Sequence, residues 1–444
     1  MRFDVRVLRA IVSLSDVSLC VVFLPLTLSA ENWPGWRGPH GDGSSSETNI
    51  PTEWHFEPGK PSQSKNIAWR VSLETAIGHS SPIVWNDRVF LLGADTEQKA
   101  RVLLCLDRLS GDERWRRTVL KAPLESIHRL NSYASSTPAT DGNLVYVSFL
   151  EVDGRTVPAP NVGTPRPITP GEMVVAAYDF DGELKWKVKP GSFISAHGFS
   201  SSPVLFEDLV IVNGDHDGPA YIVALDKHTG ETVWKTEREN GVRSYCTPLI
   251  REIDGEPQLM LSGSECVASY DPRTGKRLWI VDGPTSQFVA SVVMNEGLLF
   301  VTGGFPDKHM LTIDPTGTGN ITDTHVRWHH ERTGVAYVPS PVAVGPYFVI
   351  VSDNGIASCY DADTGKRLWL HRLGRRHSAS AVNAGGLAYF PDDDGITWIV
   401  RPGPDFELIA KNNLNEPLSA SPAISQGQLF LRTETSLFCI GTTP

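Results

Sequence analysis

The stretch that decides the fold is Ala224-Leu-Asp226-Lys-His-Thr229-Gly230-Glu-Thr-Val-Trp234. It begins as an apolar strand, passes through a tight turn and leaves on a second strand headed by tryptophan. Asp226 can accept hydrogen bonds from backbone N–H groups two or three residues on, Thr229 supports that turn, and Gly230 supplies a positive φ. The pattern predicts a hairpin whose tryptophan packs flat against a neighbouring sheet.

This frame recurs along the chain with its aspartate, glycine and tryptophan in place. The repeated positions are Asp107, Gly111 and Trp115; Asp226, Gly230 and Trp234; Asp271, Gly275 and Trp279; and Asp361, Gly365 and Trp369. Tryptophans 234, 279, 328 and 369 are separated by 45, 49 and 41 residues. A period of this length, filled with strand signals, is typical of propeller blades. We expect these residues to pack between blades.

A second repeated signal marks where each innermost strand begins. Small residues, usually ending in proline, stand before β-branched or aromatic runs at Ser80–Pro82, Ser136–Pro138, Ser201–Pro203, Cys246–Pro248, Ala290–Val292, Pro339–Pro341, Ala379–Ala381 and Ala420–Pro422. Eight starts predict eight blades around a central channel. The sequence therefore indicates an all-β chain, an eight-bladed β-propeller of four-stranded antiparallel blades.

The two ends of the repeat region complete each other. Trp69 heads a strand that has no turn before it, and Leu437–Ile440 is a third strand that stops before its tryptophan strand. We expect the Trp69 strand to complete the last blade and close the ring, which removes exposed sheet edges. The predicted propeller spans residues 66–444. The seventh blade lacks the turn signature, and the polar, proline-rich insertion from Val157 to Pro170 predicts a surface loop.

Two segments precede the propeller. Residues 1–30 have a basic start and an apolar body that predict an export signal, either cleaved or kept as an anchor. Cys20 is a candidate for lipidation, but Leu19 before it is a poor match to a lipidation motif. Residues 31–65 form a leader rich in Trp, Pro and Gly. We expect it to lie along the outer wall or one face with Trp33 and Trp36 docked; the alternative is a binding loop that presents these aromatics.

Composition excludes one class of partner. The 444-residue chain has a net charge of −11 and 20% charged residues, so nothing suggests electrostatic capture of nucleic acid. No stretch after residue 30 is long and apolar enough to span a bilayer. We expect an exported protein, periplasmic, secreted or at the cell surface, and monomeric.

The repeated frame, Ala-x-Asp-x-x-Thr-Gly-x-x-x-Trp, resembles the tryptophan-docking repeat of quinoprotein-like (pyrroloquinoline quinone, PQQ-type) β-propellers over roughly residues 66–440. The leader Trp33-Pro-x-Trp36-Arg-Gly-Pro39 is similar to that of many exported, uncharacterised propellers of this kind. The family includes PQQ-dependent alcohol and sugar dehydrogenases and non-enzymatic scaffolds, such as an outer-membrane assembly lipoprotein. The resemblance therefore implies the fold and leaves the function open.

The dehydrogenases of that family commonly stack PQQ on a disulfide of adjacent cysteines and hold Ca²⁺ with Glu, Asn and Asp. No two cysteines are adjacent in this chain. Cys105, Cys359 and Cys439 occupy a slot that Ala, Ser and Thr fill in other repeats, which indicates free core thiols. Cys246 and Cys266 fall in one blade, and a disulfide between them stays open. No catalytic residues are assigned.

Metal-binding signals are weak. Asn213, Asp215 and Asp217 resemble the first half of a calcium loop that lacks its later glutamate, so a hairpin turn is the preferred interpretation and a cation site the alternative. Asp392–Gly395 is interpreted as a solvated turn. His325, His329 and His330 lie in or just after an outer strand; they are interpreted as surface residues, with a ligand role as the alternative.

Cationic and imidazole side chains gather on the outer-to-inner connections, which in a propeller reach the channel mouth. They are His79, His128, Arg129, His197, Arg243, Tyr245, Arg376 and His377. Together they favour an anionic ligand, whereas any one of them can point outward.

We therefore interpret the chain as a non-catalytic binding or scaffolding module. Its channel mouth would bind an anionic small molecule or a carboxylate-bearing chain, and its side wall would dock an envelope protein. One alternative is a PQQ- and Ca²⁺-dependent alcohol or sugar dehydrogenase with a divergent pocket. Another is a scaffold that acts only in protein assembly.

Overall fold

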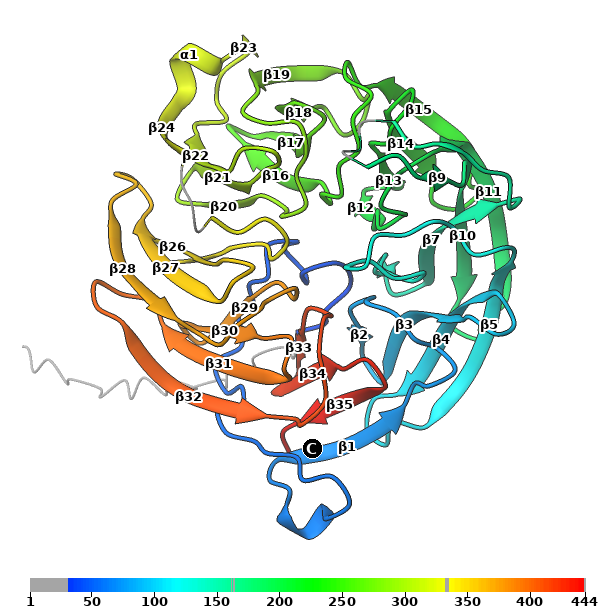
Figure 1. Cartoon of the computed structure of the whole chain (residues 1–444), viewed down its shortest axis with the longest axis vertical. Coiled ribbons are helices and arrows are strands. Elements are labelled where there is room, and N and C mark those ends of the chain that lie inside the picture. The colour runs from blue at the N-terminus through cyan, green and yellow to red at the C-terminus, as the bar shows by residue number, and fades with distance from the viewer. Residues whose placement is uncertain (1–30, 161, 163, 332–334, 443–444) are drawn as a thin grey trace, which may run out of the picture.

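In the described residues, eight β-sheets of four or five strands are arranged around a central axis (Figure 1). The computed structural model describes residues 31–160, 162, 164–331 and 335–442, so the predicted export signal at 1–30 lies outside the described residues. Helical structure in the described residues is confined to η1 (Pro61–Gln63) and α1 (Thr322–His325). None of the helices in these ranges is long and apolar enough to cross a membrane. The predicted all-β, eight-bladed propeller is confirmed.

Each blade begins with its innermost strand, next to the axis, and ends with a strand on the outer wall. In that order the first four blades contain β2 (Ile83–Trp85), β3 (Arg88–Asp95), β4 (Ala100–Asp107) and β5 (Glu113–Lys121); β6 (Ala139–Thr140), β7 (Leu144–Val152), β10 (Gly171–Asp179) and β11 (Leu184–Phe193); β12 (Val204–Phe206), β13 (Leu209–Gly214), β14 (Tyr221–Asp226) and β15 (Thr232–Glu237); and β16 (Leu249–Ile253), β17 (Glu256–Gly263), β18 (Cys266–Tyr270) and β19 (Arg277–Asp282).

The last four blades contain β20 (Val293–Asn295), β21 (Leu298–Gly303), β22 (His309–Ile313) and β24 (Val326–Glu331); β25 (Val342–Val344), β26 (Tyr347–Val351), β27 (Ile356–Asp361) and β28 (Arg367–Arg372); β29 (Val382–Ala384), β30 (Leu387–Pro391), β31 (Ile396–Arg401) and β32 (Glu407–Asn413); and β33 (Ala423–Ser425), β34 (Gln428–Arg432), β35 (Ser436–Ile440) and β1 (Ile67–Ser72).

The ring closes as the sequence predicts. β1 pairs antiparallel with β35, with Trp69 opposite Cys439, and so completes the eighth blade (Figure 1). The buried guanidinium of Arg432 adds a second tie, because it donates to the carbonyls of Ala76 and Leu92 in the first blade region, both at 2.7 Å. Closure therefore rests on backbone pairing together with one buried cation.

The predicted turn forms as written in the sequence. Oδ1 of Asp226 accepts from the backbone N–H groups of His228 at 2.9 Å and Thr229 at 2.8 Å. Gly230 has a φ of +76°. A Cβ at Gly230 would lie 2.6 Å from the indole of Trp186 in the preceding blade, so the indole rests directly on the glycine. The turn is formed by local hydrogen bonds, and its glycine also provides the surface on which the tryptophan of the preceding blade packs.

The same docking joins successive blades around much of the ring. The pairs are Trp69 on Gly111, Trp115 on Gly182, Trp186 on Gly230, Trp234 on Gly275 and Trp328 on Gly365. Trp279 departs from the pattern, because its fully buried indole donates to Gln258 Oε1 of its own blade at 2.8 Å. In that blade β23 (Gly319–Asn320) adds a fifth strand, parallel to β19.

The small residues at the strand starts form a hydroxyl girdle around the axis. We define the girdle as Ser81, Thr137, Ser202, Thr247, Ser291, Ser340, Ser380 and Ser421, one residue from each blade. A backbone N–H of one blade donates to the hydroxyl of the next at 2.9–3.2 Å for Ser81 to Thr137, Thr137 to Ser202, Thr247 to Ser291, Ser291 to Ser340, Ser340 to Ser380 and Ser380 to Ser421. Because backbone groups of crowded inner strands need partners, hydroxyls at these positions satisfy them and link the blades.

The leader crosses the ring centre and then follows the outer wall (Figure 1). Trp33 pairs with Val84 of the first blade, and Asp42 forms an ion pair with Arg251 of the fourth at 2.6 Å. Farther on, the backbone N–H of Trp54 donates to Asn412 Oδ1 on the outer strand β32 at 2.9 Å. Trp33 and Trp54 are buried, so the leader packs as part of the propeller.

Two local expectations were wrong. The insertion from Val157 to Pro170 contains a small antiparallel ladder, β8 (Val157–Pro158) with β9 (Pro167–Ile168), because its proline residues lie at positions that the two-residue ladder tolerates. Asp392 is not solvated; it is buried and accepts from the indole Nε1–H of Trp398 at 3.0 Å. That tryptophan of the seventh blade caps its own hairpin.

Candidate functional site

A cavity of about 720 Å³ lies on the propeller axis. All eight outer-to-inner connections contribute to its lining, as the propeller geometry predicts. The lining residues are Trp36, His79, His128, Leu130, Asn131, Ser135, Val162, Thr164, Arg166, His197, Ser200, Ser202, Arg243, Tyr245, Thr247, Gln287, Val289, Phe305, Tyr337, Val338, Ser340, Ser378, Ser380, Ser419 and Ser421. Hydroxyls, imidazoles and aromatic rings therefore form most of its polar and apolar wall.

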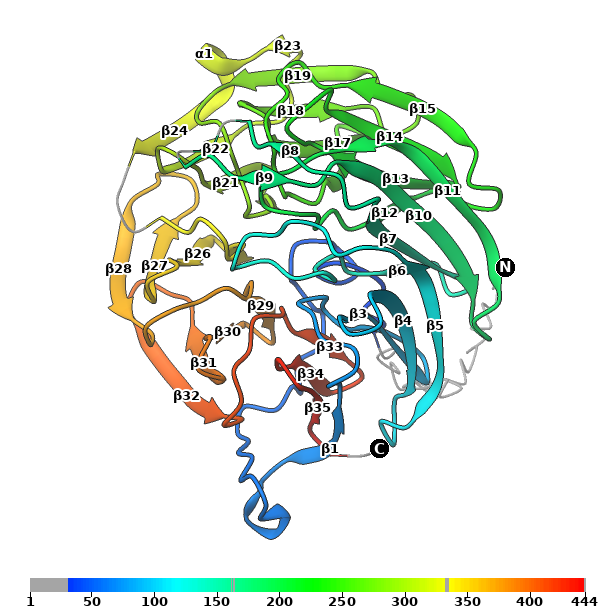
Figure 2. The same cartoon turned by 45° about the vertical axis from the view of Figure 1, so that its right-hand side comes forward.

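Two segments outside the regular blades complete the wall. Trp36 reaches the cavity from the leader, and its indole N–H donates to the girdle residue Ser291 at 3.3 Å. Arg166 comes from the insertion and donates through Nη2 to the carbonyl of Ala196 at 2.6 Å, while its buried Nε–H has no hydrogen-bond partner among the residues that the structure describes. Figure 2 shows the insertion strands β8 and β9 on the side of the molecule where the outer-to-inner connections run. The insertion is therefore part of the site.

The structure brings together five of the residues predicted at the channel mouth: His79, His128, His197, Arg243 and Tyr245. The other three do not line the cavity. Arg129 is exposed to solvent. Arg376 is also exposed and lies 3.7 Å from Asp393. His377 turns into the blade, where its two ring nitrogens contact the carbonyls of Pro391 and Leu373.

Burial lowers the pKa of the cavity histidines and so favours their neutral forms. Burial, assisted by the positive charge of Arg432, lowers the pKa of His79 to about 4. Burial together with Arg243 lowers the pKa of His197 to about 3. Burial also lowers the pKa of His128, whose ring lies 4.9 Å from that of His197. These imidazoles supply hydrogen bonds to a ligand, whereas the positive charge comes from the guanidinium groups.

Carboxylates near the cavity face the backbone of the connections. Asp217 pairs with Arg243 at 2.7 Å and accepts from the N–H of Ala196 at 3.0 Å. Asp353 accepts from the N–H groups of Tyr337 and Val338, at 2.9 and 3.1 Å. These aspartates hold the connections in shape. Among the described lining residues none is Asp or Glu, so the surface offered to a ligand carries cations and neutral polar groups.

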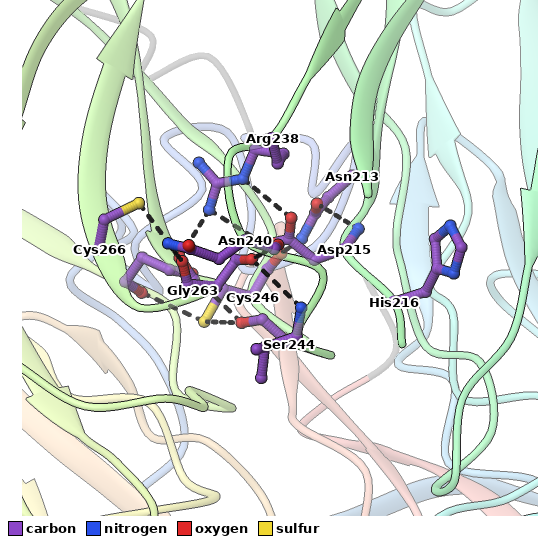
Figure 3. A network of polar contacts seen from close by, with 12 residues as sticks. Asn213, Asp215, His216, Arg238, Asn240, Ser244, Cys246, Gly263 and Cys266 are labelled. Atoms are coloured by element: carbon purple, nitrogen blue, oxygen red, sulfur yellow. Dashed lines mark hydrogen bonds and ion pairs between the residues drawn. The ribbon is translucent and has the colours of Figure 1, made fainter. Parts of the chain in front are cut away.

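Asn213 lies near the end of β13, and Asp215 and Asp217 follow it in the connection to β14. Figure 3 shows Asn213 and Asp215 in a network of polar contacts. Asp215 faces Arg238, with Nε to Oδ1 at 2.9 Å and Nη2 to Oδ2 at 3.1 Å. Asn213 donates through Nδ2 to the carbonyl of Cys246 at 3.0 Å. The buried guanidinium of Arg238 is thus paired with the Asp215 carboxylate that a bound cation would need as a ligand.

The five described cysteines are free and buried. Cys246 and Cys266 lie in the network of Figure 3 without a bond between them, and the Cys246 thiol instead accepts from the hydroxyl of Ser262 at 3.2 Å. Burial raises the pKa of Cys105, Cys246, Cys359 and Cys439 to about 12, so these thiols stay protonated and unreactive. They act as small core residues.

The residues present do not fit a PQQ–calcium centre. Ca²⁺ needs six to eight oxygen ligands, mainly carboxylates, and the described lining supplies no carboxylate. A dehydrogenase base would also have to come from this wall. The aromatic groups Trp36, Tyr245 and Tyr337 could contact a flat ring. The described lining, however, has no carboxylate that would bind the metal ion next to that ring.

Sequence reasoning missed Trp36, Arg166 and Tyr337 as cavity residues. Trp36 and Arg166 belong to the leader and the insertion, whose path is not encoded in the blade repeat. Tyr337 lies three residues before the girdle residue Ser340, close to the place that Tyr245 occupies two residues before Thr247. That similar spacing is a signal that could have identified it.

Comparisons with known proteins agree with the architecture. The family described as outer membrane protein assembly factor BamB matches residues 162–282 and 281–389, together more than half of the chain. Over 100 residues the chain is 29% identical to outer membrane protein assembly factor BamB of Burkholderia pseudomallei (strain K96243), which is 22% of this chain and 26% of that relative. The matched stretch thus spans about a quarter of that protein.

Two solved structures share the fold at low identity. BamB from Moraxella catarrhalis has a TM-score of 0.56 and 14% identity, covering 84% of this chain and 96% of that one. A europium-containing methanol dehydrogenase has a TM-score of 0.52 and 13% identity, covering 90% of this chain and 89% of that one. One is an assembly factor and the other an oxidoreductase, so the fold alone does not separate the two functions.

Proposed function

This chain belongs to the family of outer membrane protein assembly factor BamB, and from that premise we propose that it is an exported, non-catalytic scaffold that binds other envelope proteins. The predicted export signal supports the location. The observation that carries the proposal is the cavity wall, which has hydrogen-bonding groups from all eight connections and lacks carboxylates among its described residues. Such a wall suits binding better than covalent chemistry.

The cavity is proposed to take a carboxylate of an extended chain or of a small anionic molecule. Arg166 and Arg243 supply the positive charge, and the Nε–H of Arg166 has no hydrogen-bond partner within the described part of the chain. Charge-assisted hydrogen bonds from guanidinium to carboxylate are among the strongest available. The imidazoles of His128 and His197 and the girdle hydroxyls supply further hydrogen bonds. Asp217 repels a second carboxylate near Arg243, which favours ligands with one acidic group at this point.

The outer wall is proposed as a second contact surface for partner proteins. Single apolar side chains are exposed along the outer strands, at Leu184 (52%), Val233 (52%), Leu370 (51%) and Leu408 (44%). They lie on four different blades. The cavity therefore carries the sharper proposal.

Site-specific photo-crosslinking tests the scaffold and the cavity together. A photoreactive phenylalanine at position 130, where Leu130 lines the cavity, is expected to form adducts with envelope proteins in intact cells. Arg166→Gln should reduce the adduct about tenfold, because a charge-assisted hydrogen bond is worth about 1.5–3 kcal/mol. Arg376→Gln, a cation outside the cavity, is the matched control and should leave the yield unchanged.

A second crosslinker at Leu408 on β32 separates the outcomes. Adducts from position 408 and none from position 130 would move partner binding to the outer wall and reject the cavity. No adduct from either position would contradict the scaffold itself. Equal loss with Arg166→Gln and Arg376→Gln would show a general charge effect instead of a specific site.

The alternative, a PQQ-dependent alcohol or sugar dehydrogenase with a divergent pocket, predicts a different response. Purified protein titrated with PQQ is expected to show no quenching of tryptophan fluorescence that depends on Ca²⁺, because the described lining has no carboxylate to hold the ion. Trp36 lines the cavity and would report binding there. Saturable quenching that requires Ca²⁺ would favour the dehydrogenase and justify an assay of alcohol and sugar oxidation.

A further inference from the structure

A cluster of three metal-ligating side chains lies in the fifth blade, away from the cavity wall. His309 begins β22, and His329 and Glu331 lie near the end of the outer strand β24. In the register of these strands His309 is opposite Glu331, and Leu311 is opposite His329. Because side chains alternate along a strand, all three project from one face of the sheet. Their ligand atoms lie within 4.8 Å of one another.

The two histidines lie within hydrogen-bond distance of each other, but that contact leaves the other ring nitrogen of His309 without a partner among the described residues. Nδ1 of His309 lies 2.9 Å from Nε2 of His329. His309 is 5% exposed, and its other nitrogen, Nε2, is buried with no hydrogen-bond partner among the described residues. A neutral imidazole has one donor and one acceptor nitrogen, so either tautomer leaves that buried atom unsatisfied. The pair therefore holds two ring nitrogens 2.9 Å apart, and one of its two histidines is itself buried.

We propose that His309, His329 and Glu331 bind a divalent first-row transition ion, with zinc as the best match. Two imidazole nitrogens and one carboxylate oxygen are a known zinc ligand set that leaves a further position for water or a partner's side chain. At zinc–ligand distances of about 2.0–2.2 Å, tetrahedral ligand atoms lie about 3.3 Å apart. The histidine pair is already near that separation.

The accessible ligands let the site close without disturbing the core. His329 and Glu331 are exposed on the outer strand, so the carboxylate can rotate toward the imidazoles and an ion can enter from solvent. His309 is fixed by burial and presents the pre-positioned nitrogen. Imidazole ligands select transition ions over Ca²⁺ and Mg²⁺, which prefer oxygen donors. This proposed metal site is separate from the cavity on the axis, which is proposed to bind the carboxylate of a ligand.

The neighbouring histidine provides a matched control. His330 follows His329 but projects from the opposite face, where Nε2 contacts the carbonyl of Gly365 at 3.1 Å and the ring packs 5.2 Å from Trp328. Removing it deletes one imidazole from the same strand while leaving the three proposed ligands intact. His330 thus distinguishes a specific site from general binding to surface histidines.

The test is zinc binding by purified full-length protein without a polyhistidine tag, measured by competition with a chromophoric chelator. We expect one Zn²⁺ per chain, and an increase in the melting temperature when zinc is added, because an ion that binds only the folded state stabilises it. His329→Ala and Glu331→Gln should each weaken binding at least about tenfold, because mutating even the outer-shell partner of a metal ligand costs about 10- to 100-fold. His330→Ala should leave the affinity unchanged.

Two results would overturn the proposal. One is the absence of saturable zinc binding by the wild-type protein. The other is equal weakening by His329→Ala and His330→Ala, which would show non-specific binding. Because His329 and Glu331 are exposed, their variants should fold, and circular dichroism checks that they do. Co²⁺ gives a second readout, since visible absorption that disappears in His329→Ala would show direct coordination.

Discussion

Replacing Trp234 by alanine is expected to lower the free energy of unfolding by about 3–5 kcal/mol, the range for deleting a buried large aromatic side chain. The indole is 9% exposed and rests on Gly275 of the next blade, where an added Cβ would lie 2.5 Å from the ring. Its Nε1–H donates to the carbonyl of Pro272 at 3.0 Å. The variant therefore leaves a cavity between two blades and an unpaired carbonyl. Chemical denaturation measures the loss.

Two companion variants make the Trp234 result specific. Trp234→Phe keeps a ring on Gly275 but loses the donor, so it should cost less than alanine. Val233→Ala changes the adjacent side chain, which is 52% exposed, and should cost less than about 1 kcal/mol. A Trp234→Ala variant as stable as Val233→Ala would contradict the view that tryptophan docking holds the blades together.

Replacing Arg238 by alanine is expected to cost about 3–5 kcal/mol, because it leaves the Asp215 carboxylate buried without its counter-charge. The Arg238 and Asp215 side chains are 1% and 0% exposed. The guanidinium also donates to the carbonyl of Gly263 at 2.7 Å (Figure 3). It donates to the hydroxyl of Tyr270 at 2.8 Å as well. Burial raises the pKa of Asp215, and the guanidinium opposes that shift. Chemical denaturation again measures the loss.

A double variant separates the charge from the packing. Arg238→Met with Asp215→Asn removes both charges while keeping similar volumes, so it should be more stable than Arg238→Ala alone. The single variants Arg238→Met and Asp215→Asn complete a double-mutant cycle, which isolates the coupling free energy between the two side chains. If the double variant were less stable than Arg238→Ala, the cost would come from lost packing and hydrogen bonds and not from the unpaired carboxylate.

The hairpin turn and the strand order could be predicted because they depend on local chemistry. Asp226, Thr229 and Gly230 form their hydrogen bonds within six residues, so their pattern is visible in the sequence. Ring closure by the Trp69 strand was predictable for a related reason. An incomplete repeat at each end leaves one strand missing and one to spare, and only their pairing satisfies both sets of backbone groups.

The candidate site could be predicted only in part, because side chains on irregular connections take their direction from packing. Arg376 and His377 immediately precede Ser378, which lines the cavity, yet one points to solvent and the other into the blade. His309 and His329 are separated by 20 residues, and only the register of β22 with β24 brings them together. The pattern of the outer strand alone places His329 on the surface and does not reveal its partner.

The sequence by itself therefore determined the repeating blade, the number of blades and the closure of the ring, because turn hydrogen bonds and strand alternation act over a few residues. The tertiary structure alone decided that the strand-start hydroxyls link the blades in a girdle. It also decided that the leader crosses the axis and that Trp36 and Arg166 enter the cavity. These contacts join residues far apart in the chain, and the shape of the closed ring selects them.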